Sequence, residues 1–178
     1  MNSIKDIPDY LLSQYQEELI QKLINIIDSK SSDFSYVATG PRMSGTKDAL
    51  TIMLAILLVT RPNFHVTVLC PYRNIGERLA DLTYHWLVQM QKNDEVRKSK
   101  TNIWKDTSGV FFTCAQDIVL KSWSPEVLII TEAEYIPPSS IAHLFLPTTS
   151  ATKVIVMNNT IGNIMYIDEL WTSARKDK

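Results

Sequence analysis

The sequence predicts a three-layer α/β domain, in which helices cover both faces of a mainly parallel sheet. Short, nearly all-apolar segments alternate with segments whose apolar residues recur at helical spacing. The apolar segments lack the alternating polar positions of a sheet that faces solvent, so both of their faces should be buried. With 178 residues and 45% hydrophobic composition, the chain is long enough for one domain with a substantial core.

The expected elements alternate along the chain. Leu and Ile recur at helical spacing over 11–27, and an apolar strand over 34–39 then leads into a loop that contains glycines. The segment 92–100 is polar and rich in lysine, and it is expected to be a connection. Further strands are expected at 65–70, 126–131 and 153–157, a hairpin around a Ser-Gly turn at 102–105 and 110–114, and helices at 47–60, 74–91, 137–146 and 163–175.

Composition narrows the classes of function. A net charge of −1 gives no overall attraction for DNA or an anionic membrane, so any nucleic-acid contact would need a local patch. The N-terminus has no signal-peptide pattern, and the apolar stretch 49–59 is too short for a membrane span. Cys70 and Cys114 each close an apolar segment and are expected to be buried thiols outside any disulfide. We therefore expect an intracellular protein of a reducing compartment.

The loop after the first strand has a phosphate-binding pattern. Gly40 and Gly45 are spaced as in G-x-x-x-x-G-K-[ST], and a helix follows directly. The backbone N–H groups of such a loop and the positive end of the helix dipole attract phosphate. Thr46 and Lys47 follow Gly45, however, so the lysine and the hydroxyl stand in inverted order. Glycine pairs between a strand and a helix are common, and the loop alone is weak evidence for nucleotide binding.

A second candidate site residue follows the strand at 126–131. In P-loop nucleotidases an Asp at this strand tip holds Mg²⁺, and a following Glu polarises the attacking water. Here Thr131 takes the place of the Asp, and Glu132 takes the place of the Glu. The carboxyl ends of parallel strands meet at one edge of a sheet, so the loop and Glu132 should face a common site. A solvated strand end is the alternative interpretation of Glu132.

Three motifs in this order resemble the motor domain of viral terminase large subunits, the DNA-packaging ATPases of tailed phages and herpesviruses. They are the loop at 41–45, the strand tip at 129–137 and the segment 153–171, and the resemblance extends from Tyr15 to Trp171. It implies a P-loop NTPase-like fold with ATP and Mg²⁺ as ligands. It also implies viral packaging or assembly proteins as partners, together with double-stranded DNA, inside the infected host cell.

The resemblance also implies roles for individual residues. Tyr15 and Gln16 would help to seat the adenine, Arg42 would lie near the phosphates, and Glu132 would be the catalytic carboxylate. From the residues alone, a core position for Tyr15 and a surface position for Gln16 are equally compatible with the helix pattern. Thr46 would also ligate Mg²⁺. The implied nucleotide-binding set is Tyr15, Gln16, Gly40, Arg42, Gly45, Thr46 and Lys47, and the implied coupling motif, which senses the γ-phosphate, is Asn158, Asn159 and Thr160.

The motifs depart from the family pattern in three places. Moving the lysine one position, to Lys47, rotates it by about 100° and shifts it by ~1.5 Å along the helix axis. Thr131 lacks the charge that anchors a metal, and Asn158 and Asn159 replace hydroxyl residues. Phosphoryl transfer depends on positioning and charge stabilisation, and these changes weaken both. We therefore expect a nucleotide site in which hydrolysis is lost or much reduced.

Three functions are compatible with these motifs. The first is a scaffold or regulatory component of viral genome packaging or assembly with a degenerate nucleotide site. The second is an active, ATP-hydrolysing packaging motor in which Arg42 and Lys47 share the phosphate role. The third is a P-loop fold reused as a protein-interaction module. Motif order favours the first two, and the departures favour the first. Because the chain ends at Lys178, without room for the nuclease domain of a terminase large subunit, we expect a single terminase-like domain over 1–178.

Overall fold

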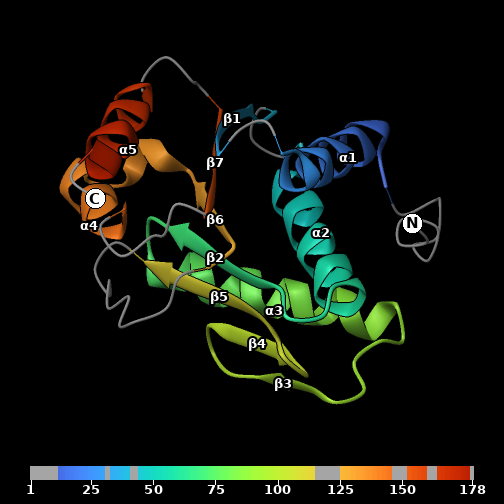
Figure 1. The fold of residues 1–178 in the computed structure, drawn as a ribbon. Coiled ribbons are helices and arrows are strands. Elements are labelled where there is room, and N and C mark those ends of the chain that lie inside the picture. The colour runs from blue at the N-terminus through green and yellow to red at the C-terminus, as the bar shows by residue number, and fades with distance from the viewer. Residues whose placement is uncertain are drawn as a thin grey trace.

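In the part of the chain that the structure describes, seven strands form one central sheet, in the order β1-β7-β6-β2-β5-β4-β3 (Figure 1). The computed structural model describes residues 12–30, 33–40, 44–114, 125–145, 152–159 and 164–176. The elements are α1 (Gln14–Asp28), β1 (Phe34–Ala38), α2 (Thr46–Thr60), β2 (His65–Cys70), α3 (Arg73–Gln89), β3 (Val96–Lys98), β4 (Asn102–Lys105), β5 (Ser108–Cys114), β6 (Val127–Thr131), the 3₁₀-helix η2 (Ala133–Tyr135), α4 (Pro138–Phe145), β7 (Lys153–Asn158) and α5 (Tyr166–Lys176).

The larger part of the sheet is parallel. β1, β7, β6, β2 and β5 pair in parallel, whereas β4 and β3 extend the sheet beyond β5 as antiparallel strands. β7 comes late in the chain but lies between β1 and β6. The predicted mainly parallel sheet is therefore confirmed, and its antiparallel strands are confined to one edge.

Helices cover the two faces of the sheet in separate groups. Side chains alternate between the faces along each strand, so Val66 and Val68 of β2 join the core under α1, α2 and α3, while Leu69 joins the core under α4 and α5. Figure 1 shows α4 and α5 on the opposite side of the sheet from α1 and α2. The prediction of three layers is therefore confirmed.

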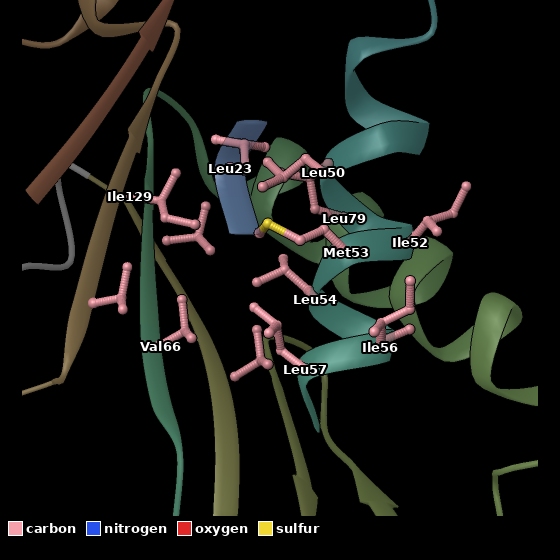
Figure 2. Packing of buried hydrophobic residues seen from close by; sticks show 14 of the residues in the cluster. Leu23, Leu50, Ile52, Met53, Leu54, Ile56, Leu57, Val66, Leu79 and Ile129 are labelled. Atoms are coloured by element: carbon pink, nitrogen blue, oxygen red, sulfur yellow. The ribbon is translucent and has the colours of Figure 1, made fainter. Parts of the chain in front are cut away.

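Helix α2 is enclosed by its neighbours. Every residue from 49 to 58 is buried, because α1 and α3 flank the helix and the sheet lies beneath it. Figure 2 shows Met53, Leu54 and Leu57 between α2 and the strands that carry Val66 and Ile129. This enclosure fixes the first turn of α2, and hence the end of the loop that precedes it. None of the described helices is both long and apolar enough to cross a membrane.

Two local predictions were wrong. The segment 92–100 contains the edge strand β3, which pairs with β4. The sequence did not reveal this strand, because an exposed edge strand can consist of polar residues without alternating apolar positions. The hairpin turn lies at Asp106, where φ is 52°, and not at Ser108, which is part of β5. Ser108 is buried, and its hydroxyl donates to the carbonyl of Arg61 and accepts from the N–H of Phe64. These two hydrogen bonds explain why a serine, which is common in turns, occupies a buried strand position here.

Candidate nucleotide site

A cleft of about 880 Å³ lies at the edge of the sheet where β1, β6 and β7 end and α2 begins. Ligand sites of open α/β sheets are expected at this edge. The predicted site residues that line the cleft are Gly40, Gly45, Thr46, Lys47, Glu132, Asn158 and Asn159. Two further predicted residues, Arg42 and Thr160, lie outside the described residues.

Strand β7 brings the loop and the tip of β6 together. The N–H of Thr39, at the start of the loop, donates to the carbonyl of Asn158 at 3.0 Å. The N–H of Glu132 donates to the carbonyl of Met157, the preceding residue of β7, at 3.1 Å. Both segments are therefore attached to the same strand end, which positions the side chain of Glu132 opposite the loop.

Lys47 and Glu132 form an ion pair across the cleft. The distance between Lys47 Nζ and Glu132 Oε1 is 2.9 Å, and the two side chains are 44% and 32% exposed. Ion pairs with this exposure contribute about 0–1 kcal/mol to stability, because water screens them. The pair can therefore open at low cost when an anionic ligand enters. The inverted lysine thus reaches the strand-tip carboxylate, which the sequence did not predict.

The backbone of Glu132 has an uncommon conformation. Its φ of 52° and ψ of 44° lie in the left-handed region, where a residue other than glycine is energetically disfavoured. Glu132 lies between the end of β6 and the 3₁₀-helix η2, whose Tyr135 N–H donates to the carbonyl of Glu132. This turn directs the chain away from the sheet directly after the strand, and the carboxylate lines the cleft.

The position expected to anchor a metal is neutral and buried. Thr131 ends β6 and is 6% exposed, and the hydroxyl of Thr46 already interacts with those of Tyr15 and Ser44. Within the described ranges, no group of three or more His, Cys, Asp or Glu side chains is arranged to hold a metal ion. Asp48, Glu132 and Glu134 supply the carboxylates of the cleft lining. Mg²⁺ commonly takes one or two protein carboxylates together with phosphate oxygens of its ligand, so an ion here would depend on a nucleotide for part of its coordination.

Helix α1 places Tyr15 and Gln16 against the loop. The hydroxyl of Tyr15 accepts the N–H of Gly40 and lies 3.1 Å from Thr46 Oγ1. The side-chain amide of Gln16 donates to the carbonyl of Gly45 at 3.3 Å. Both side chains are half-buried, and neither belongs to the described lining of the cleft. The structure thus brings both residues to the site, on the side of the loop that faces α1.

Other cleft residues were missed by sequence reasoning. Tyr72 and Arg78 of the α3 region and Tyr135 of η2 line the cleft, and Tyr72 and Tyr135 are 51% and 49% exposed. Tyr72 lies two residues after the end of β2, so its place at the cleft could have been predicted from the rule that ligand sites lie at the carboxyl ends of parallel strands. Arg78 lies within α3, and no sequence pattern marks its approach to the loop.

Cys70 lies near the ion pair of the cleft. Burial, followed by the negative charge of Glu132, raises the pKa of Cys70 to about 12, and the charge of Lys47 opposes this shift. Neither Cys70 nor Cys114 forms a disulfide, and both are buried, as predicted. The thiol of Cys70 is therefore neutral and poorly nucleophilic at physiological pH.

The raised pKa of Cys70 predicts a loss of stability in alkaline solution. The unfolded thiol ionises near pH 9.0 and the folded thiol near 12, so unfolding releases a proton between these values. The free energy of unfolding should fall by about 1.4 kcal/mol per pH unit through this group alone. Denaturant melts from pH 8 to 11 measure how the free energy of unfolding changes with pH. In Cys70→Ala the contribution of this thiol, about 1.4 kcal/mol per pH unit, should be absent. Equal slopes in both proteins would contradict the prediction.

Comparison with known proteins identifies the fold. Neither the known family models nor the curated proteins include a match to this sequence. Among solved structures, the bacteriophage HK97 large terminase superposes with a TM-score of 0.70 at 14% identity over 93% of this chain, which spans 37% of that protein. A mutant form of the ATPase domain of the Thermus phage P74-26 large terminase gives 0.61 at 16% identity, covering 82% of this chain and 69% of that one.

A third structure, the large terminase of the thermophilic bacteriophage D6E, gives a TM-score of 0.60 at 12% identity, covering 89% of this chain and 43% of that one. At such low identities the likeness is one of fold. The three-layer α/β architecture predicted from the sequence is thus also found in these three phage proteins. The chain has the α/β fold found in the large terminases of phages.

Proposed function

We propose that this chain is a terminase-like nucleotide-binding domain with a degenerate site, acting as a scaffold or regulatory component of viral genome packaging or assembly. Its site binds ATP or ADP and hydrolyses ATP poorly or not at all. The observation that carries the proposal is Thr131, an uncharged residue that is 6% exposed and ends β6 at the cleft, where a working site needs a carboxylate to hold the metal. The ion pair of 2.9 Å between Lys47 and Glu132 opens at low cost, so it leaves Lys47 available to an incoming phosphate.

The start of α2 supports the binding of an anionic ligand. Gly45 precedes the helix with φ of 81° and supplies no side-chain cap, so the N–H groups of the first turn have no partner within the helix. These groups lie at the cleft beside Lys47. Donors of this kind, together with the helix dipole, favour phosphate. The D6E large terminase, which has the same fold, has been solved in complex with ADP and with ATP-γ-S.

The strand tip argues against efficient hydrolysis. Thr131 provides no negative charge for a metal ion, and Thr46 directs its hydroxyl to protein partners. Phosphoryl transfer needs cations that neutralise the charge developing on the phosphoryl oxygens. Among the described residues, Lys47 and Arg78 line the cleft with positive charge, and Lys47 is partly neutralised by Glu132. Binding without turnover is the behaviour that this combination favours.

An active packaging motor is the second candidate, and one observation favours it. Glu132 keeps the position of a water-activating carboxylate, opposite the loop and within reach of Lys47. If a nucleotide draws Lys47 to its phosphates, the carboxylate becomes available as a general base. An active motor predicts ATP-dependent phosphate release that disappears in Glu132→Gln.

Thermal melting with nucleotides tests the proposed function. The protein is melted alone and with Mg²⁺-ATP, with Mg²⁺-ADP and, as a control without phosphate, with adenosine. A nucleotide at about a hundred times its Kd should add roughly 2.7 kcal/mol to the free energy of unfolding. We expect a raised Tm with both nucleotides and no phosphate release. An unchanged Tm would contradict nucleotide binding and favour a protein-interaction module, and steady turnover would favour the active motor.

A further inference from the structure

We propose that Tyr15 and Gln16 are positioning residues for the phosphate loop, which they hold at its two glycines. In this role they act on any phosphate ligand, whatever its base. The proposal rests on the proposed function in one respect, namely that the loop receives a phosphate. It differs from the adenine contact that the resemblance implies for the same two residues.

A chain of hydroxyl groups connects the two ends of the loop through Tyr15. The N–H of Gly40 donates to Tyr15 Oη, which lies 3.1 Å from Thr46 Oγ1, and this oxygen lies 2.9 Å from Ser44 Oγ. A hydroxyl donates one hydrogen bond and accepts up to two. Tyr15 can therefore accept from Gly40 and donate to Thr46, which donates in turn to Ser44. One side chain of α1 thus fixes the spacing between the two ends of the loop.

Gln16 holds the second glycine. Its Nε2 donates to the carbonyl of Gly45 at 3.3 Å, while its Oε1 accepts the N–H of Ser13 at 2.8 Å. The second bond belongs to the capping box that starts α1, so the amide cannot rotate freely. The side chain therefore joins the start of α1 to the start of α2.

Helix α1 leaves little space for a side chain at either loop glycine. A Cβ on Gly40 would lie 3.0 Å from Cζ of Tyr15 and 2.8 Å from Cβ of Ser44. A Cβ on Gly45 would lie 2.3 Å from Nε2 of Gln16, and the φ of 81° disfavours other residues there. The two glycines that suggest a phosphate loop in the sequence are thus the two positions on which α1 packs.

This bracing prepares the loop for a ligand before the ligand arrives. Helix α1 is anchored in the core by Leu19, Ile20 and Leu23, and α2 is enclosed. Gly40 and Gly45, the described ends of the loop, are therefore held between two rigid helices through Tyr15 and Gln16. A loop whose ends are already fixed loses less conformational entropy on binding, which increases affinity. The gain does not depend on which base the ligand carries.

Binding to three ligands separates bracing from base recognition. The full chain and Tyr15→Phe are titrated with ADP, GDP and inorganic tripolyphosphate, which has no base. Loss of a neutral hydrogen bond weakens binding by about fivefold. We expect Tyr15→Phe to weaken all three ligands by the same factor, and Gln16→Ala to do likewise. Weaker binding of ADP with unchanged binding of tripolyphosphate would overturn the proposal. The control is Tyr84→Phe, which removes the hydroxyl of a half-buried tyrosine on α3 away from the cleft.

Hydrogen exchange at Gly40 tests the brace without any ligand. The N–H of Gly40 donates to Tyr15, so Tyr15→Phe should increase its exchange rate about tenfold, while amides in the middle of α2 keep their rates. An unchanged rate at Gly40 would overturn the proposal. If the wild-type protein bound none of the three ligands, the proposed function would fail, and the exchange rate would still decide whether the brace exists.

Discussion

Replacing Glu132 with glutamine should strengthen nucleotide binding, whereas replacing Lys47 with methionine should abolish most of it. Glu132→Gln removes a negative charge that would face the phosphates of the proposed nucleotide, and it releases Lys47 from its ion pair of 2.9 Å. At ~6 Å and an effective dielectric constant of about 20, one unit of repulsion amounts to ~3 kcal/mol, of which solvent screening leaves part. We expect about tenfold tighter binding of Mg²⁺-ATP. Lys47→Met removes charge-assisted hydrogen bonds and should weaken binding by about 10- to 100-fold.

Calorimetric titration of both variants measures these opposite effects. The ion pair is partly exposed, so each variant should keep nearly the stability of the wild type. A matched control is the pair of Lys98 and Asp81, whose Nζ–Oδ1 distance is 2.7 Å and which lies outside the cleft. Lys98→Met and Asp81→Asn should leave binding unchanged. If Glu132→Gln weakened binding as much as Lys47→Met does, the carboxylate would be part of the binding site and not a competitor of the phosphates.

The fold was predictable because its main signals are local. A strand that is buried on both faces is an unbroken apolar segment, and β2 and β6 show this in the sequence. Helix α2 is likewise apolar all round because it is enclosed. The edge strand β3 escaped prediction because its exposed side chains carry no such signal. Strands and helices that are buried on all sides were therefore predictable from the sequence, whereas the exposed edge strand was not.

The geometry of the site was predictable only in part. The general rule for parallel sheets placed the loop and Glu132 at one edge. Their contact depends on β7, which lies between β1 and β6, and no sequence pattern specifies that order. The sequence predicted only that the lysine is rotated and shifted from its usual position in the loop. Its ion pair with Glu132 also depends on the left-handed turn after β6, which no sequence pattern reveals.

The contact of α1 with the loop also lay beyond sequence reasoning. From the helical pattern alone, a core position for Tyr15 and a surface position for Gln16 were as compatible as the adenine contacts that the resemblance implies. Both are half-buried, because α1 crosses α2 where the loop ends. The crossing is set by packing between Leu23 of α1 and the apolar face of α2 (Figure 2). Contacts between helices that are separated in sequence depend on such packing and not on periodicity.

Leu54→Ala should destabilise the protein more than a substitution in the cleft. Leu54 is fully buried in α2, facing the sheet. Removing a buried leucine side chain costs about 2–5 kcal/mol, since transfer energy is lost and a cavity remains. A domain of this size is stable by about 5–15 kcal/mol, so the loss is a large fraction of the total. At roughly 2–4 °C per kcal/mol, the Tm should fall by about 10 °C.

Chemical denaturation of Leu54→Ala and of a surface control measures this difference. The control is Val88→Ala on α3, whose side chain is 42% exposed and should cost less than about 1 kcal/mol. Because α2 carries the end of the loop, the folded fraction of Leu54→Ala should still bind nucleotide with the affinity of the wild type, provided that its first turn keeps the contact with Gln16. A cost below about 1 kcal/mol for Leu54→Ala would mean that α2 is not enclosed between α1, α3 and the sheet. If fully folded Leu54→Ala bound nucleotide much more weakly than the wild type, the core under α2 would determine the loop geometry, and the contacts of Tyr15 and Gln16 would not.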